Sequence, residues 1–415
     1  MKFIKNLFKT LISIIILTLC YVLVSQGFTK IYKAPTSKPF TGERFYNPYQ
    51  GIDSAQWSDG FLKSNFHAHT NFDVTGDYTP EEFRDAYILS NYDLINISDH
   101  NFITPAVEHR IKSLDSYEHG YNINNFHQLM MGVSENDMMD IPFMIMPRHQ
   151  MQYLTERLAP QATLFSFNHP ERLRLLDKEV VRDLRGWSVM ELNPNADPTY
   201  WDMQLSEGNY VAMICNDDAH SITNRTSWFQ RAFTMVFPDG GENVHDIIKG
   251  VKRASTYGLV IEVERNQQGP HKDMPWITGI ELDVDTLSIG FSEIAQKIEF
   301  VAQNGMNLYT VEKTDHASLV IPKDAQYVRI QATMDNGVRI FTNAIARSED
   351  GLQPQILPIP ESIEWLRVLN TIFWALLGVV LFIVFMLIIW RKRKPKQVAF
   401  EYTRRGAGQK TYDPN

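Results

Sequence analysis

The chain has 415 residues, of which 44% are hydrophobic and 21% charged, and its formal net charge at pH 7 is −8. This length suffices for one large enzymatic domain, a smaller module and accessory segments. Residues 30–390 carry 29 Lys and Arg against 46 Asp and Glu. That acidic surplus argues against a nucleic-acid partner, because affinity for a phosphate backbone comes mainly from basic contacts.

The N-terminal residues predict an association with a membrane. Residues 10–24 are apolar and follow three lysines, Lys2, Lys5 and Lys9. We interpret residues 1–29 as either a retained membrane anchor or a signal segment, since the apolar run is short for a full span. Residues 30–60, which are rich in Pro, Gly and aromatic residues, are expected to form a linker that leads away from the membrane.

The C-terminal residues predict a transmembrane helix over 366–390. Residues 371–390 contain no charged side chain, and Arg391-Lys-Arg-Lys follows directly. A run of this length spans a hydrocarbon core of about 30 Å, and the basic flank is typical of the cytoplasmic side. We therefore expect a basic cytoplasmic tail over 391–415 and a catalytic domain outside the cytoplasm, at the cell membrane.

Between these segments the hydrophobic pattern predicts two domains. Residues 61–264 alternate short apolar runs with amphipathic stretches, and Thr79-Pro80 begins one such stretch with proline at the first helical position. This alternation is typical of an α/β fold with a parallel sheet. Residues 275–350 instead show period-two strands separated by Asn-Gly turns, which predicts a small antiparallel β-sandwich.

Two short motifs predict a metal site. His67-Ala-His69 and Asp218-Ala-His220 each stand at the polar end of an apolar, strand-like run. Side chains two apart in a strand point to the same face, so each motif presents two ligands side by side. Further candidates in similar contexts are Asp99 and His100, Glu135, and His169 in Asn-His-Pro. Ligands at many strand ends indicate a metal centre at the carboxyl rim of a barrel-like sheet.

In their order and spacing these motifs resemble the PHP (polymerase and histidinol phosphatase) metallohydrolases. The resemblance rests on Asn65-Phe-His-Ala-His-Thr70, Ser98-Asp-His100, Asn168-His-Pro170 and the run from Gly208 to His220. It covers residues 62–262 and is closest to the carbaryl-hydrolase-like branch, which carries a β-rich domain after the barrel. The resemblance implies a distorted (β/α)7 barrel with two or three divalent ions at the strand ends.

The resemblance also implies a set of ligands. His67 and His69 would share one ion with Asp218, Glu135 would bridge two ions, and His169 would bind the second. His100 and His220 would serve a third ion or complete the second. Val74 stands where the family often has Asp or His, so we expect two ions. Zinc, manganese and iron all suit imidazole and carboxylate ligands.

Other polar residues receive different interpretations. Asp99 is expected to orient a ligand histidine, and Arg225 to clamp a phosphate or carboxylate of the substrate. The remaining histidines are interpreted as surface or loop residues: His109, His119, His127, His245, His271 and His316.

These features predict a membrane-tethered hydrolase in which a metal-activated water attacks the substrate. A phosphoester is the first expected target, and an amide, carbamate or ester bond the second. The substrate would be a small molecule or an envelope-derived compound, with membrane lipid as the other partner. The alternative is a non-catalytic, membrane-anchored binding or sensor module that retains the barrel.

Overall fold

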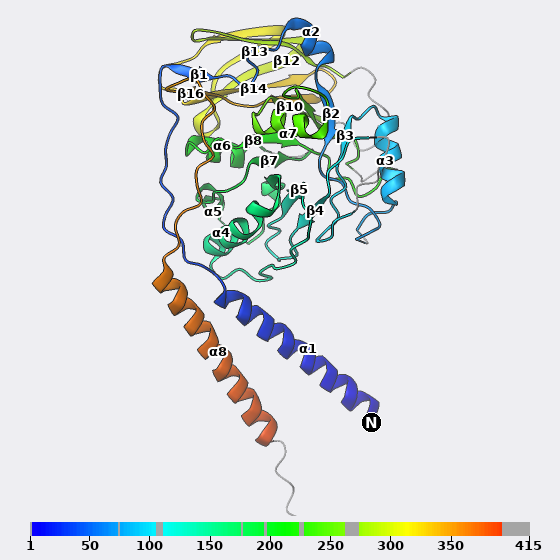
Figure 1. Ribbon diagram of the computed structural model, residues 1–415, viewed down its shortest axis with the longest axis vertical. Helices are drawn as coiled ribbons and strands as arrows, with labels where there is room; N and C mark the ends of the chain where they lie inside the picture. Colours follow the sequence, from blue (N-terminus) through cyan, green and yellow to red (C-terminus); the bar gives the residue numbers. More distant parts are fainter. Residues whose placement is uncertain are drawn as a thin grey trace, which may run out of the picture.

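The protein has a mixed α/β fold with two long helices projecting from one end (Figure 1). The computed structural model describes residues 2–73, 75–104, 111–175, 177–194, 197–223, 228–261 and 274–391. The helices are α1 (Lys2–Gly27), α2 (Ser54–Asp59), α3 (Pro80–Leu89), α4 (Pro147–Leu158), α5 (Glu179–Arg182), α6 (Thr199–Ser206), α7 (Val244–Lys252) and α8 (Glu364–Arg391). The strands of the first part are β1 (Arg44–Tyr46), β2 (Leu62–Asn65), β3 (Leu94–Ile95), β4 (Ser116–His119), β5 (Gln128–Met131), β6 (Leu164–Phe167), β7 (Val189–Leu192), β8 (Ala212–Cys215), β9 (Ala232–Val236) and β10 (Thr256–Ile261). Those that follow are β11 (Ile277–Asp283), β12 (Thr286–Ala302), β13 (Met306–Val320), β14 (Tyr327–Met334), β15 (Val338–Thr342) and β16 (Ile345–Ser348).

Local sequence accounts for the element boundaries near the site. Helix α3 begins where Thr79 caps it: the Thr79 hydroxyl accepts from Glu82 N, and the Glu82 carboxylate accepts from Thr79 N. This reciprocal capping satisfies two donors that a helix start otherwise leaves unpaired. Strands β6, β7 and β8 are buried along their whole length, in keeping with their mainly apolar composition, which Ser166 and Glu191 interrupt.

The strands that carry the site form a closed path of pairings. One sheet has the order β4-β5-β6-β7-β8, and the other ends in β9-β2-β3. Two isolated parallel bridges join them, His100 to Glu118 and Ala68 to Ala219. The path β2-β3-β4-β5-β6-β7-β8 therefore returns to β2, and it brings strand ends distant in sequence around one point.

This path departs in two respects from the predicted (β/α)7 barrel. Strand β5 runs antiparallel to both β4 and β6, whereas the barrel expectation has all strands parallel. Only residues 120–127 connect β4 to β5, which is too short for the helical crossover that parallel neighbours need. In addition, the strands belong to two hydrogen-bonded sheets that meet only at isolated bridges.

The C-terminal strands are antiparallel, as predicted, but they do not form a separate β-sandwich. Strand β15 pairs with β10 from Tyr257↔Thr342 to Ile261↔Val338, so β11–β16 continue the sheet of β9 and β2. The expectation of an independent sandwich is therefore wrong. Strand β12 has 17 residues; it pairs with β13 along one edge and with β11 and then β14 along the other.

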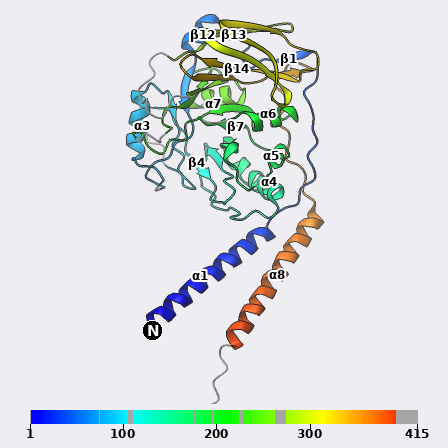
Figure 2. The same cartoon turned by 180° about the vertical axis from the view of Figure 1, so that it is seen from behind.

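Helices α1 and α8 leave the same end of the domain and diverge from it in both views (Figures 1 and 2). Thr10–Gly27 and Glu364–Leu387 are long and apolar enough to cross a membrane. The helices meet where they join the domain: Asn370 Nδ2 donates to Gln26 O at 2.9 Å, and Thr371 Oγ1 donates to Gly27 O at 2.8 Å. Both candidate spans therefore join the domain at the same end.

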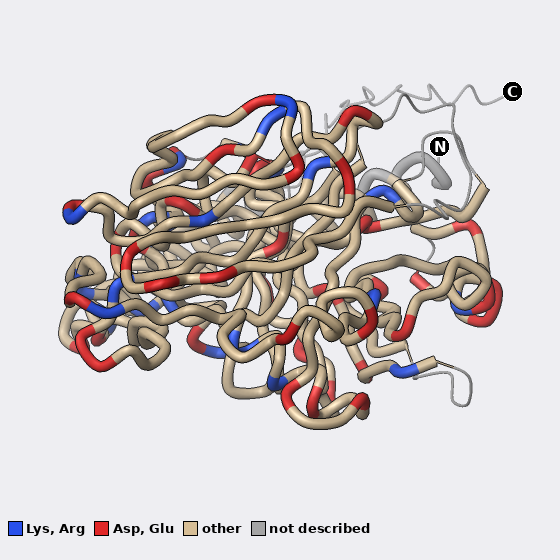
Figure 3. Tube along the Cα trace, turned by 90° about the horizontal axis from the view of Figure 1, so that it is seen from above, with Lys and Arg blue, Asp and Glu red and all other residues tan. Residues whose placement is uncertain are grey.

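The opposite end of the molecule carries a mixed surface charge. Seen from above, acidic and basic residues are interspersed over the β-rich layer (Figure 3). Neither sign gathers there into one continuous patch.

Candidate metal centre

The two histidine-containing motifs are paired side by side beyond the ends of β2 and β8. The isolated parallel bridge joins Ala68 to Ala219, and His69 N donates to Ala219 O at 2.8 Å. Asp218 N likewise donates to His67 O at 3.1 Å. Because alternate residues of an extended segment face the same side, His67 and His69 point the same way, and the pairing brings Asp218 beside them.

His67, His69 and Asp218 form a compact group of three ligand atoms. The two histidine Nε2 atoms are 3.0 Å apart. Asp218 Oδ1 lies 3.3 Å from His67 Nε2 and 3.2 Å from His69 Nε2. Ligands about 2.0–2.2 Å from a tetrahedral zinc ion are separated by roughly 3.3 Å. The three atoms thus have the spacing of one face of a coordination shell and could hold a metal ion.

Glu118 of β4 lies at the centre of the site, between two sets of histidines. Its side chain is 1% exposed. Oε1 lies 3.4 Å from His67 Nε2, 3.0 Å from His169 Nε2 and 3.3 Å from His127 Nδ1. Oε2 lies 3.3 Å from His69 Nε2 and 3.1 Å from His100 Nδ1. A carboxylate whose two oxygens face different imidazoles is suited to bridge two metal ions.

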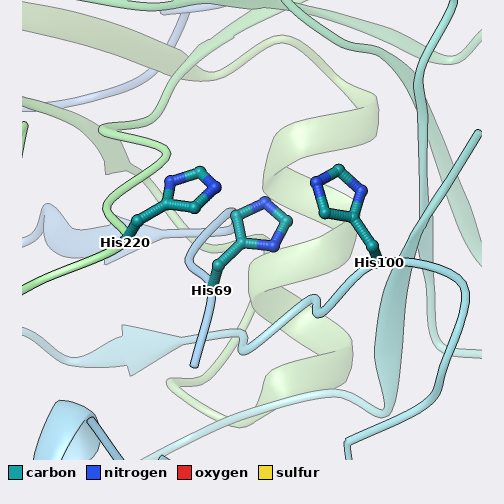
Figure 4. Close-up of side chains that lie close together, drawn as sticks. All are labelled: His69, His100 and His220. Atoms are coloured by element: carbon teal, nitrogen blue, oxygen red, sulfur yellow. The ribbon is translucent and has the colours of Figure 1, made fainter. Parts of the chain in front are cut away.

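His100 and His220 form the solvent-accessible side of the site. In Figure 4, His69 lies between them, with ring centroids 4.3 Å from His220 and 4.4 Å from His100. The side chains of His100 and His220 are 24% and 40% exposed, whereas those of His67 and His69 are fully buried. A reactant would therefore approach the centre past His100 and His220.

The outer nitrogens of the innermost histidines are held by carboxylates. His67 Nδ1 lies 2.8 Å from Glu191 Oε1, and His69 Nδ1 lies 3.3 Å from Asp73 Oδ2. A proton on each Nδ1 leaves the Nε2 atoms as electron-pair donors toward the centre. Asp73 also accepts from His100 N, so it ties two ligand-bearing loops together.

Asp218 is oriented by an arginine on the neighbouring segment. Arg172 Nη1 donates to Asp218 Oδ2 at 2.6 Å, which leaves Oδ1 directed at the histidines. The Arg172 guanidinium also lies 4.4 Å from the ring centre of Trp228. This cation–π contact restrains the arginine on its other side.

The carboxylates set the protonation of the inner histidines. Burial disfavours the charged form of His67, but the nearby carboxylates, Glu191 foremost, outweigh it and raise the pKa of His67 well above its usual value. The same balance, with Asp218 foremost, raises the pKa of His69. Burial prevails at His100 and lowers its pKa to about 3. Metal ions at the inner histidines would therefore displace protons.

Within the described part of the chain, three buried polar atoms that face other ligand atoms of the cluster lack hydrogen-bond partners. They are Asp218 Oδ1 and the Nδ1 atoms of His100 and His127. A buried polar atom without a partner costs about 1–3 kcal/mol. Each of the three faces another ligand atom of the cluster, so a shared cation would satisfy them. The residues present therefore fit a site for divalent ions, and their mixed chemistry does not select one metal.

Two ligand-bearing positions have a left-handed backbone. His169 has φ +27° and Asp218 has φ +49°, although neither is glycine. Such conformations cost on the order of 1–3 kcal/mol each and persist where the surroundings enforce them. At both positions the backbone turns sharply after a buried strand, which directs the side chain into the cluster.

The structure gathers six of the seven predicted ligands into this cluster: His67, His69, His100, His169, Asp218 and His220. Glu135 is the exception. It is exposed in the segment after β5 and belongs to none of the ligand groups among the described residues. Because β5 runs in the reverse direction, its end lies away from the carboxyl rim, and Glu118 of β4 takes the central position instead.

His119 and His127 also differ from the surface or loop interpretation. His127 belongs to the cluster, and His119 is buried, with Nε2 2.9 Å from Met139 O. Residues 116–119, Ser-Tyr-Glu-His, form strand β4 although their polar composition does not predict a strand. Glu118 stands directly before His119, and His127 follows within the next ten residues. This clustering is the one signal in the sequence that could have pointed to Glu118 and His127.

Asp99 has a different environment from the one expected. Its carboxylate accepts from Thr70 N at 2.6 Å, from Thr70 Oγ1 at 2.8 Å and from Thr104 Oγ1. It therefore holds the loop that follows His69 rather than the ring of a ligand histidine. Arg225, Val74 and the tail from residue 392 lie outside the described residues.

Comparisons with known proteins do not assign the chain to a family. Neither a family model nor a curated protein matches it. Among solved structures, the crystal structure of PsfC from Pseudomonas syringae PB-5123 is similar with a TM-score of 0.29 and 11% sequence identity, covering 44% of this chain and 84% of that chain. A similarity at this level carries no conclusion about fold or function, and the PHP resemblance stays a prediction.

Proposed function

We propose that this protein is a membrane-tethered, metal-dependent hydrolase of the PHP type, acting first on phosphoesters. The observation that carries the proposal is the position of Glu118, whose two oxygens face separate sets of imidazoles. Bridging carboxylates of this kind hold two ions close together, as hydrolytic two-metal sites require. Amide, carbamate and ester bonds are the second choice of substrate.

Two divalent ions, when bound here, would supply a water of lowered pKa and stabilise charge on the attacked group. The inner ligands would be His67, His69 and Asp218, with Glu118 between them and the remaining histidines. Glu191 and Asp73 hold the rings of His67 and His69 so that Nε2 faces inward. We expect His100 and His220, which line the accessible side, to contact the substrate or complete the second ion.

Asp99 and Arg172 act as positioning residues in this proposal. Asp99 fixes the loop at Thr70. Arg172 directs Asp218 Oδ1 inward by binding Oδ2. With Arg172 engaged in this way, Arg225 is the arginine proposed to clamp the negatively charged part of the substrate.

The domain would lie outside the cytoplasm. Both candidate spans meet the domain at one end, at Gln26 and Asn370. Basic residues stand at the opposite end of each span, at Lys2, Lys5 and Lys9 and from Arg391 onward. Basic flanks favour the cytoplasmic side, which puts the domain on the other face of the membrane.

The test begins with elemental analysis of the full chain purified in detergent without chelators. Stoichiometric zinc, manganese or iron is expected. Phosphomonoesters, phosphodiesters and carbamates are then screened with the metal retained, and the H67A/H69A double variant should lose both metal and turnover. Protein that binds no metal at stoichiometric level would remove the basis of the proposal. Bound metal without turnover on any of these bonds would favour the non-catalytic sensor instead.

A further inference from the structure

The loops around the metal centre expose large apolar side chains to solvent. We call the segments 70–73, 101–104, 120–127 and 139–146 the rim loops. Phe72 lies three residues after His69, and Phe102 two after His100. Their exposed apolar side chains, each between 43% and 57% exposed, are Phe72, Phe102, Ile123, Phe143 and Ile145. Exposed apolar groups that gather on one rim mark a surface that contacts another apolar phase.

Hydrogen bonds tie the rim loops to the candidate membrane span. Tyr21, inside Thr10–Gly27, is hydrogen-bonded through its hydroxyl to Tyr121 and donates to Asp140 O at 3.0 Å. Gln26 Nε2 donates to Phe143 O at 2.7 Å. Since these partners lie in the last two turns of the span, segments 120–127 and 139–146 of the rim loops sit at the level where the span leaves the membrane.

The accessible side of the metal centre belongs to the same rim. Loop 120–127 joins the strand that carries Glu118 to His127, and Ile123 N donates to Pro142 O at 3.1 Å, which links it to segment 139–146. His100 and His220 line the accessible side, and Phe102 lies just beyond His100. The apolar side chains therefore border the approach to the centre. In Figure 1, helix α1 lies below the part of the domain that carries β4 and β5.

We infer that the rim loops insert their apolar side chains into the outer interface of the bilayer, and that the substrate is a membrane lipid. Its polar head would enter the metal centre while its tails stay in the membrane. This inference rests on the proposed function. In the reaction, the oxygen of water bonds to phosphorus, the bond from phosphorus to the leaving alcohol breaks, and that alcohol takes a proton from the water.

Docking can be measured without catalysis. The full chain in a C20S background, carrying I145C labelled with a polarity-sensitive fluorophore, is placed in lipid nanodiscs containing a doxyl-labelled phospholipid. Cys215 is buried and would not label. V320C on β13 is the control away from the rim, and G378C in α8 is the membrane control, since a Cβ at Gly378 meets no atom within 4 Å.

We expect strong quenching at I145C and G378C and none at V320C. An unquenched I145C label beside a quenched G378C label would overturn the inference. So would a label that is shielded from water yet unquenched, because that result indicates cover by a second copy or another protein. Failure of quenching at G378C would also overturn it, because α8 would then not enter the bilayer.

The substrate class has its own test. A short-chain, water-soluble phosphodiester and a diacyl phospholipid with the same head group are compared with metal-loaded protein in nanodiscs. The F143S/I145S variant should lose lipid hydrolysis by about tenfold or more, since two large apolar side chains lose their burial, while keeping the soluble activity. The V320S variant should keep both activities.

Hydrolysis of the soluble ester alone, with no effect of F143S/I145S, would reject the lipid substrate and leave the proposed function standing. Hydrolysis of neither ester by metal-loaded protein would also reject the lipid substrate, and the screen of phosphomonoesters and carbamates would then decide the proposed function. The quenching result would then still decide whether the rim docks on the bilayer.

Discussion

Oε2 of Glu118 lies 3.3 Å from Nε2 of His69, while the other carboxylate oxygen faces His67, His169 and His127. A single buried side chain thus connects the ligands of β2 to those of β3, β5 and β6. In the metal-free protein its negative charge stabilises the protonated form of the neighbouring imidazoles. Burial disfavours the charged carboxylate, but its histidine neighbours outweigh this and hold the pKa of Glu118 well below its usual range.

The first prediction concerns this carboxylate. The E118Q substitution keeps the shape but removes the charge shared by both ligand sets, so metal affinity should fall by more than the roughly 10–100-fold typical of an outer-shell change. Competition titration with a chromogenic chelator measures this. E135Q is the matched control, because Glu135 is exposed, and it should bind metal as the parent does. Equal affinities for E118Q and the parent would contradict the site described here.

The second prediction concerns Glu191, which holds His67 Nδ1 at 2.8 Å and also accepts from Asn216 Nδ2 at 2.9 Å. E191Q retains a polar group but no longer fixes the tautomer of His67, so metal affinity should fall by about 10–100-fold. E293Q on β12 should leave it unchanged. If calorimetry finds E191Q as tight as E293Q, Glu191 does not orient the ligand.

The third prediction is the pH dependence of metal binding. The pKa of His67 and that of His69 are raised by the surrounding carboxylates, which favours the imidazolium form of these rings in the metal-free protein. Metal affinity should therefore increase as pH rises through those pKa values, with proton release on binding. Titration calorimetry in buffers of different ionisation enthalpy detects the released protons. Binding without proton release at pH 7 would contradict it.

The same pKa shifts predict how the stability of the metal-free protein depends on pH. A histidine whose pKa is raised on folding stabilises the folded protein. This stabilisation is complete below the pKa of the histidine in the unfolded chain, about 6.5, and is lost as pH rises through its pKa in the folded protein. The lowered pKa values of Glu118 and Asp218 contribute stability above about pH 4, which is lost as pH falls through the folded values. Thermal unfolding of metal-free protein should thus show a falling melting temperature above about pH 6.5. Metal-loaded protein should lack this decline.

The fourth prediction tests the link between the C-terminal strands and the site-bearing part. Arg329 on β14 binds Asp202 on α6 through two hydrogen bonds of 2.8 Å, and both side chains are buried. R329M would leave the buried carboxylate of Asp202 without its cationic partner and should cost about 3–5 kcal/mol of unfolding free energy. K297M, which breaks the more exposed pair with Glu299, should cost less than about 1 kcal/mol. Denaturant unfolding followed by circular dichroism compares them, and equal costs would contradict the prediction.

Sequence alone determined the features that depend on local order along the chain. The spacing of two residues in His67-Ala-His69 puts both imidazoles on one face of an extended segment, whatever the rest of the fold does. The apolar runs that become α1 and α8 are equally local, since length and composition decide whether a helix could cross a membrane. The helix cap at Thr79 is also determined by local sequence.

Only the tertiary structure decided which carboxylate occupies the centre, because that depends on strand direction and on contacts between distant segments. The short connection after β4 reverses β5, which carries Glu135 away from the rim and leaves Glu118 among the histidines. Pairing of β10 with β15 made the C-terminal strands part of one sheet, although their own pattern suits a sandwich equally well. The hydrogen bonds from Tyr21 to the rim loops likewise join segments a hundred residues apart, and no local pattern encodes them.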